Sequence, residues 1–237
     1  MKLSIVVPVH NMVAGNKLRF CLDSLVNQTI SDYEIIAVDD ASTDESFEVL
    51  KEYESKYPWK FKALQSYENR KQGGARNMGM EAASGTWIGF VDSDDYIDSG
   101  MYEALYKAAF NNCADLVISG MSFVDGNTFG KSGEYIEKNY FEKETVFEKE
   151  DVKKLILGVV GALPYEPDDS RYGVSVCKNI FKRSLLCNEE IKFVSERKII
   201  SEDTIFMVDY IKSIKKAVGI SGAFYRYRRN DSSLSKS

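Results

Sequence analysis

Thr86-Trp87-Ile88-Gly89-Phe90-Val91-Asp92-Ser93-Asp94-Asp95 joins an apolar run to a cluster of acids. The apolar half is typical of a buried strand, and the acids follow where that strand ends. Carboxylates packed this closely repel one another, and a hard divalent cation such as Mg²⁺ or Mn²⁺ would neutralise them. A cation held by one or two carboxylates usually keeps positions free for water and substrate phosphates. The stretch therefore predicts a nucleoside-diphosphate site, with a polar turn after a strand as the alternative.

Strands and helices alternate on both sides of this stretch. Continuous apolar runs predict strands, and 3.6-residue periodicity or helix-start signals predict the helices between them. The strands are expected at Leu3 to Val9, Glu34 to Val38, Phe61 to Tyr67 and Thr86 to Val91. Helices are expected around Leu18 to Leu25, from a capping box at Ser42-x-x-Glu45 to about Lys56, and after Gly73-Gly74. This order predicts an α/β fold with a mostly parallel central sheet, right-handed crossovers and flanking helices.

Three polar clusters fall at the predicted carboxyl ends of these strands. They are His10-Asn11, Asp39-Asp40 and Asp92 to Asp95. Parallel sheets bind ligands at that edge. We therefore expect the three clusters to converge in one crevice, which is stronger evidence for a site than any single cluster.

The second half of the sequence is less regular. We expect a strand at Leu116 to Ser119, hairpins or a loop from Met121 to Lys149, and an exposed loop from Ala162 to Gly173. Glu202-Asp203 leads into a predicted helix with Ile205, Val208 and Ile211 on its apolar side. Alternating aromatic and basic residues from Phe224 to Arg229 predict a final strand.

Composition narrows the class of protein. The 237 residues are 44% hydrophobic and 28% charged, with a net charge of −5 and no basic block. Nucleic acid is an unfavoured partner, because binding a phosphate backbone needs clustered Lys and Arg. We expect neither a signal peptide nor a membrane-spanning run of about 20 apolar residues. Four cysteines without a C-x-x-C predict reduced thiols, and a single histidine excludes a multi-histidine metal site.

At this point the sequence resembles the inverting nucleotide-sugar glycosyltransferases of family 2, which have the GT-A fold. Individually the matching segments are weak, but they occur in the family's order and cover most of the chain. They are Ile5 to Asn11, Val38 to Asp44, Gly74 to Asn77, Phe90 to Asp95 and Ser201 to Phe206. The family usually has Tyr at the position of His10 and Gly at that of Ala41.

The resemblance implies a donor site. Pro8, Val9, His10 and Asn11 would line the nucleotide pocket through backbone contacts, unless His10 is a loop residue that only packs beside the base. Asp39 would accept a hydrogen bond from a pyrimidine N–H. Asp40 would lie toward the ribose or cap the next helix, and Arg76 would approach the base or phosphates or form a surface salt bridge.

The resemblance also implies a metal site and a catalytic base. In Asp92-Ser93-Asp94, the family's DxD element, Asp94 would bind Mn²⁺ or Mg²⁺ directly and Asp92 would contact the ribose or a metal-bound water. Asp203 would take the proton from the acceptor hydroxyl, unless it is only a favourable charge at a helix start. Glu202 would orient Asp203 or bind the acceptor.

Arg226 and Arg228 lie on one face of the last predicted strand. By resemblance they would clamp the diphosphate, with two exposed strand arginines as the alternative. Asp168 and Asp169 could also supply a base, although no motif supports them.

The implied activity is metal-dependent, inverting transfer from a UDP-sugar to a hydroxyl of a glycan or lipid-linked acceptor, in polysaccharide or cell-surface glycan synthesis. Residues 1–120 would bind the nucleotide sugar, and residues 121–237 would form a smaller, irregular acceptor-side subregion of the same domain. A cytoplasmic location is expected, with peripheral association at the inner face of the membrane. A non-catalytic sugar-nucleotide binding domain and a nucleotidyltransferase remain the alternatives.

Overall fold

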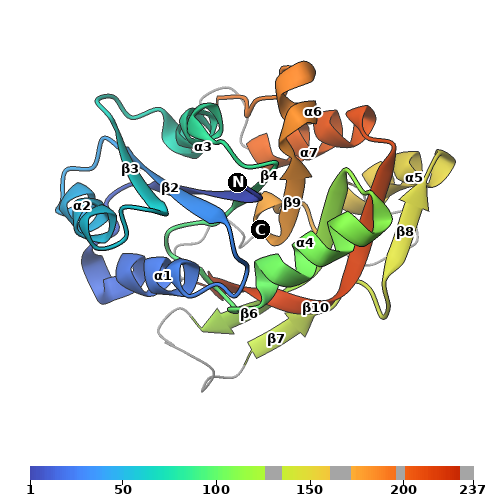
Figure 1. Ribbon diagram of the computed structural model, residues 1–237, viewed down its shortest axis with the longest axis horizontal. Coiled ribbons are helices and arrows are strands. Elements are labelled where there is room, and N and C mark those ends of the chain that lie inside the picture. The colour runs from blue at the N-terminus through green and yellow to red at the C-terminus, as the bar shows by residue number, and fades with distance from the viewer. Residues whose placement is uncertain (126–134, 161–171, 196–200, 230–237) are drawn as a thin grey trace.

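The computed structural model describes residues 1–125, 135–160, 172–195 and 201–229. One sheet of ten strands runs through this part of the chain, with helices on both of its faces (Figure 1). Eight strands follow the order β3-β2-β1-β4-β9-β6-β10-β5, while β7 pairs with β6 and β8 pairs with β10. The sheet continues across residue 120, because β6 spans Leu116–Asp125.

The first half is a parallel α/β unit. Its strands are β1 (Leu3–Val9), β2 (Tyr33–Asp40), β3 (Phe61–Ser66) and β4 (Trp87–Phe90). Its helices are α1 (Lys17–Val26), α2 (Ser46–Lys56) and α3 (Lys71–Ala82). The strand order reverses after β3, so right-handed crossovers place α3 on the opposite face from α1 and α2. The reversal lies between β1 and β4, and open α/β sheets bind ligands at such a switch point.

The second half completes the sheet with antiparallel and mixed pairing. The strands are β5 (Tyr96–Ile97), β6, β7 (Tyr135–Lys138), β8 (Thr145–Glu148), β9 (Asn179–Lys182) and β10 (Lys216–Arg229). The helices are α4 (Met101–Asn112), α5 (Glu150–Val160), α6 (Arg183–Asn188) and α7 (Glu202–Ser213). Short 3₁₀ turns lie at Ala14–Asn16 and Val176–Lys178. β9 runs antiparallel to both β4 and β6, whereas β10 runs parallel to β6.

Burial explains why the apolar runs are strands. All seven residues of β1 are buried, as a central parallel strand covered on both faces requires. α3 packs closely against this strand, because a side chain at Gly79 would collide with Val6. All four cysteines are free, with Cys21 and Cys177 buried.

Two local expectations were wrong. The predicted capping box does not form: the Ser42 hydroxyl accepts from the Asn11 N–H at 3.0 Å, and α2 begins four residues later at Ser46. The side chain of Asp44, and not that of Ser42, accepts a hydrogen bond at the start of α2, from the Ser46 N–H at 3.0 Å. The buried face of α7 also differs from the prediction, since Ile205 and Val208 are only partly buried. The residues that it buries are Glu202, Phe206, Met207, Tyr210 and Ile211.

Most of the loop expected from Ala162 to Gly173 lies outside the described residues, together with Asp168 and Asp169. Within the described part of the chain, none of the helices combines the length and apolar character needed to cross a membrane.

Candidate active site

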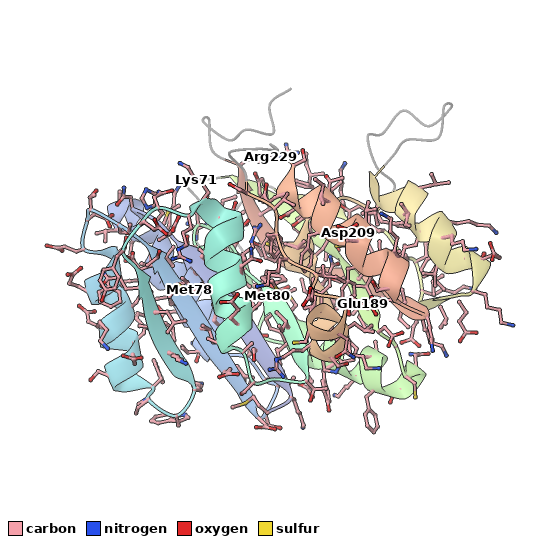
Figure 2. The ribbon with its side chains drawn as sticks, turned by 90° about the horizontal axis from the view of Figure 1, so that it is seen from above. Lys71, Met78, Met80, Glu189, Asp209 and Arg229 are labelled. Atoms are coloured by element: carbon pink, nitrogen blue, oxygen red, sulfur yellow. The ribbon has the colours of Figure 1, made fainter. Side chains whose placement is uncertain are left out.

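A cavity of about 240 Å³ opens where β1, β2 and β4 end. It joins the three predicted polar clusters with the start of α3. Its lining is Pro8, Val9, His10, Met12, Asp40, Asn69, Lys71, Gln72, Ala75, Asp92, Ser93 and Asp94. Figure 2 shows Lys71, the first residue of α3, at the same edge of the molecule as Arg229, the last residue of β10. Seven of the residues predicted from sequence thus surround one space.

Hydrogen bonds fix the His10 ring at the rim. Its Nδ1 lies 2.8 Å from the carbonyl oxygen of Asp40, which can only accept, so Nδ1 carries the proton. Nε2 is then an acceptor, and the side-chain amide of Asn69 lies 3.3 Å from it. Asn11, the next residue, accepts from the Thr43 N–H at 2.8 Å and so ties the end of β1 to the loop after β2.

Asp39 and Asp40 are the last two residues of β2, and their side chains have different surroundings. The Asp39 side chain is fully buried, and its Oδ2 accepts from the Ser42 N–H at 3.3 Å. Its Oδ1 has no hydrogen-bond partner among the described residues. An orphaned buried acceptor is costly, and a ligand N–H would satisfy it. Asp40 lines the cavity, and its Oδ1 accepts from the backbone N–H of Arg70 at 2.7 Å, immediately before α3.

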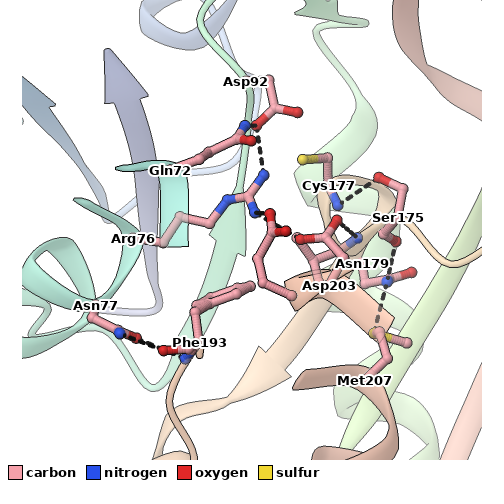
Figure 3. A network of polar contacts seen from close by, with 12 residues as sticks. Gln72, Arg76, Asn77, Asp92, Ser175, Cys177, Asn179, Phe193, Asp203 and Met207 are labelled. Atoms are coloured by element: carbon pink, nitrogen blue, oxygen red, sulfur yellow. Dashed lines mark hydrogen bonds and ion pairs between the residues drawn. The ribbon is translucent and has the colours of Figure 1, made fainter. Parts of the chain in front are cut away.

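Arg76 connects the end of β4 to the start of α7 (Figure 3). Its guanidinium is buried behind the cavity, with Nη2 2.8 Å from Asp92 Oδ1. Its Nη1 lies 2.6 Å from Asp203 Oδ1 and 3.2 Å from Glu202 Oε1. One arginine therefore holds the first acid of the predicted DxD element and both acids of the predicted catalytic pair. The prediction that Arg76 approaches the nucleotide itself remains a prediction.

Asp203 has both carboxylate oxygens engaged, since Oδ2 accepts from the Val176 N–H at 3.3 Å. Burial raises the pKa of Asp203, and the Arg76 guanidinium offsets part of this rise. Asp203 is therefore fixed in orientation, while its proton affinity is above that of an ordinary exposed aspartate. A general base needs both properties.

Asp92 and Asp94 are the candidate ligands for a divalent cation. Both line the cavity, and burial followed by the charge of Asp92 raises the pKa of Asp94. A cation would relieve this excess of negative charge. The described residues contain no group of three or more His, Cys, Asp and Glu side chains arranged to hold a metal. Two carboxylates completed by donor phosphates and water match the way proteins usually hold Mg²⁺, so the residues fit such an ion.

The model for glycosyl transferase family 2 matches residues 4–161, which is most of the chain. The chain belongs to this family.

Two of the relatives are named as glycosyltransferases of poly(ribitol phosphate). The poly(ribitol-phosphate) beta-glucosyltransferase of Bacillus spizizenii is 33% identical over 233 residues, covering 98% of this chain and 33% of the relative. The poly(ribitol-phosphate) beta-N-acetylglucosaminyltransferase TarP of Staphylococcus aureus is 31% identical over 221 residues, covering 90% of this chain and 58% of TarP. The chain thus spans between a third and two thirds of the length of such relatives.

Solved family 2 structures share the fold. S. aureus TarS (residues 1-349) aligns with a TM-score of 0.76 at 23% identity, over 96% of this chain and 60% of that structure. The same TarS fragment in complex with UDP aligns with a TM-score of 0.73 at 25% identity, over 97% of this chain and 61% of that structure. The GT-A fold expected from the sequence is therefore confirmed.

Arg226 and Arg228 of β10, the two arginines predicted to bind the diphosphate, are absent from the lining of the cavity. Arg226 pairs with Asp98, with Nη2 2.7 Å from Oδ2, and donates to Ser122 Oγ at 2.7 Å. Arg228 is buried, with its guanidinium carbon 5.0 Å from the centre of the Phe20 ring. In this structure neither arginine lines the cavity, and their predicted role on the diphosphate remains a prediction.

Sequence reasoning missed Tyr225, the residue directly before Arg226. Its hydroxyl donates to Asp95 Oδ2 at 2.6 Å and accepts from the Asp92 N–H at 3.2 Å. Asp95 also accepts from the Arg228 N–H at 2.8 Å. The alternation of Phe224 to Arg229 predicted the strand, but gave no sign that one of its aromatics holds the acidic loop.

The start of α3 was missed as well. Asn69, Lys71 and Gln72 line the cavity, although none belongs to a segment that matched the family 2 pattern. Their position directly after β3, at the carboxyl edge of the sheet, is the signal that could have identified them.

Proposed function

We propose that this chain is the catalytic domain of an inverting glycosyltransferase that transfers a sugar from a UDP-sugar, with Mn²⁺ or Mg²⁺, to a hydroxyl of a glycan or lipid-linked acceptor. The observation that carries the proposal is the Arg76 network. It holds Asp92, at the donor cavity, and Asp203, the predicted base, on opposite nitrogens of one guanidinium. A direct displacement needs an acid on the donor side and a base on the acceptor side, held at a fixed distance from each other.

The nucleotide end of the cavity supports a pyrimidine donor. Asp39 supplies a buried carboxylate oxygen without a partner among the described residues, and such an oxygen can accept from the imide N–H of uracil. The His10 ring is held in place by Asp40 and Asn69. A ring fixed at the rim of the cavity can pack against the base. The TarS complex with UDP, at 25% identity, supports UDP as the nucleotide.

The phosphate end would use the cation. Asp94 and Asp92 would hold Mn²⁺ or Mg²⁺, and the bound ion would act as a Lewis acid that stabilises the departing diphosphate. Asp95 and Tyr225 hold these ligands in place, because their hydrogen bonds fix the loop that carries them.

The acceptor end would use Asp203. In the proposed reaction, the acceptor oxygen attacks the anomeric carbon as the bond to the diphosphate breaks, and the hydroxyl proton passes to the Asp203 carboxylate. Arg76 and the Val176 N–H keep that carboxylate in place during attack. Glu202, which shares Nη1 of Arg76, contributes negative charge beside it.

The names of two relatives support a hydroxyl-rich polymer as the acceptor, and poly(ribitol phosphate) is the first polymer to test. We propose a cytoplasmic location for this domain, with access to a lipid-linked or polymeric acceptor at the inner face of the membrane.

Calorimetric binding of UDP, GDP, CDP and TDP, each with and without Mn²⁺, tests the donor assignment. UDP should bind more tightly than the other nucleotides, and Mn²⁺ should strengthen its binding. Asp94→Ala should remove the effect of Mn²⁺. Failure of the folded protein to bind any of the four nucleotides would overturn the proposal. Binding without transfer from any of a panel of UDP-sugars to poly(ribitol phosphate), lipid-linked or oligosaccharide acceptors would favour a binding domain.

A further inference from the structure

We propose that Gln72 is a positioning residue of the donor site, which turns the carboxylate of Asp92 so that one oxygen faces the donor and its cation. This inference rests on the proposed function and adds a residue to it. Gln72 lies in the first turn of α3, one helical turn before Arg76, and it lines the cavity. Figure 3 shows its side chain reaching the Asp92 carboxylate beside the Arg76 guanidinium.

Both donors meet the same oxygen. Gln72 Nε2 lies 2.6 Å from Asp92 Oδ1, and Arg76 Nη2 lies 2.8 Å from that atom. Oδ2 accepts no hydrogen bond from the described residues, and the Asp92 side chain is 21% exposed at the cavity. The two oxygens of this carboxylate therefore have different roles. Oδ1 is bound to protein donors, and Oδ2 is available to a cation, a metal-bound water or a ribose hydroxyl.

Arg76 alone would not fix this orientation. A guanidinium can bind both oxygens of a carboxylate through two parallel hydrogen bonds. Here Nη1 is occupied by Asp203 and Glu202, so only Nη2 reaches Asp92. A single bond leaves rotation of the carboxylate possible, and the second donor from Gln72 on the same oxygen opposes that rotation.

Spacing on the helix explains why this position carries the second donor. Residues four apart on a helix lie on one face, so the side chains of Gln72 and Arg76 project together toward the end of β4. Lys71, which starts the helix with a left-handed φ of 64°, also lines the cavity. The glutamine amide is also neutral. It therefore orients Asp92 without adding a positive charge that would repel the cation.

The test compares Gln72→Leu with the wild type by calorimetric titration of UDP over a series of Mn²⁺ concentrations. Leucine keeps much of the side-chain volume but has no N–H. We expect Mn²⁺-dependent UDP binding to weaken by roughly ten-fold, as for loss of one hydrogen bond to a charged group. Binding without Mn²⁺ and the thermal midpoint should change little, and a higher Mn²⁺ concentration should recover the lost affinity. A purely structural glutamine would lower the thermal midpoint and would not respond to added metal.

Gln65→Leu is the matched control, because Gln65 is also partly buried but lies outside the cavity on β3. Gln72→Asn provides a second variant that keeps the polarity of the position while its amide falls short of Asp92, and it should show the same loss. Wild-type-like Mn²⁺ dependence in both Gln72 variants would overturn this inference alone. If the wild type itself binds no nucleotide, the proposed function fails first, so the two failures are distinguishable.

Discussion

Arg76 Nη1 lies 2.6 Å from Asp203 Oδ1, although 127 positions separate the two residues in the sequence. The contact joins α3, from the parallel half of the sheet, to α7, from the mixed half. It places a carboxylate of the mixed half on the same arginine that binds Asp92, which lines the cavity. The proposed chemistry depends on this pair.

Replacing Asp203 by Asn should separate catalysis from binding. The amide keeps the shape of the side chain but cannot accept the acceptor's proton, so transfer should fall by roughly 10²- to 10⁴-fold. UDP affinity in the presence of Mn²⁺ should stay close to that of the wild type, because Asp203 lies outside the donor cavity. Initial rates and calorimetry on the same preparation measure both quantities. Equal losses in rate and nucleotide affinity would show that Asp203 has a structural role instead.

Arg76→Met should destabilise the fold as well as the site. The variant leaves Asp92, Glu202 and Asp203 without their shared cation in a largely buried setting. Removing one partner of a buried ion pair costs about 3–5 kcal/mol, which urea unfolding would measure as a loss in free energy of unfolding. Arg70→Met is the control, because the Arg70 side chain is 52% exposed and pairs only with Glu68 among the described residues. Similar stability of the two variants would contradict the interpretation of Arg76 as the centre of the network.

Asn77 provides a separate stability test on the same helix. Its side chain donates to the Phe193 carbonyl and accepts from the Phe193 N–H, both at 2.9 Å. Phe193 stacks on Phe206 of α7, with ring centres 4.0 Å apart, so Asn77 fixes the segment that packs against α7. Asn77→Ala leaves both backbone groups unsatisfied and should cost about 1–3 kcal/mol. Asn77→Asp keeps the acceptor but loses the donor. A smaller loss in free energy of unfolding at neutral pH than for Asn77→Ala would show that the bond from the Phe193 N–H is the stronger of the two. Denaturant melts of both variants decide this point.

Lys178 should make stability depend on pH. It is fully buried, its Nζ has no hydrogen-bond partner among the described residues, and it faces the Tyr140 ring at 5.2 Å. Burial lowers the pKa of Lys178 from 10.5 to about 7. Between these values the unfolded chain binds more protons than the folded one, so this lysine makes stability rise with pH. Below pH 7 the full penalty is present, and above pH 10.5 it is absent.

Lys178→Met should therefore be more stable than the wild type at pH 7, and the difference should shrink as pH increases. The limiting slope for one group is about 1.4 kcal/mol per pH unit. Free energies of unfolding measured across this window give the slope directly. Parallel curves for the two proteins would mean that the lysine has the same proton affinity in both states.

Strands β1, β2 and β4 of the parallel half could be predicted because they are buried on both faces, and this burial leaves continuous apolar, β-branched runs in the sequence. The site was partly predictable for the same reason: His10, Asp40 and Asp92 lie at or just after the carboxyl ends of strands, and these ends meet at one edge of the sheet. Local sequence signals were less reliable where a distant residue bound the side chain on which the signal depends. Ser42 has the sequence pattern of a helix cap, yet its hydroxyl is bound by the N–H of Asn11, which no local pattern reveals.

Side-chain partners were the least predictable part. Burial of Arg76 depends on two acids far along the chain, and the direction of Gln72 depends on the position of Asp92 Oδ1, the oxygen that Arg76 also binds. The apolar face of α7 was misassigned because its periodicity is weak, and the stack of Phe193 on Phe206 decides which side turns inward. These are pairwise contacts between distant segments, whereas sequence periodicity reports only which face of an element is apolar.

The hydroxyl of Tyr225 holds both the backbone of Asp92 and the side chain of Asp95. The acidic loop is made early in synthesis, but the tyrosine that shapes it is added 133 residues after Asp92. A nascent chain that has completed only the parallel half has the carboxylates without their support. The proposed donor site is thus assembled from both ends of the sequence, and it cannot reach its final geometry on the ribosome until β10 has emerged and paired.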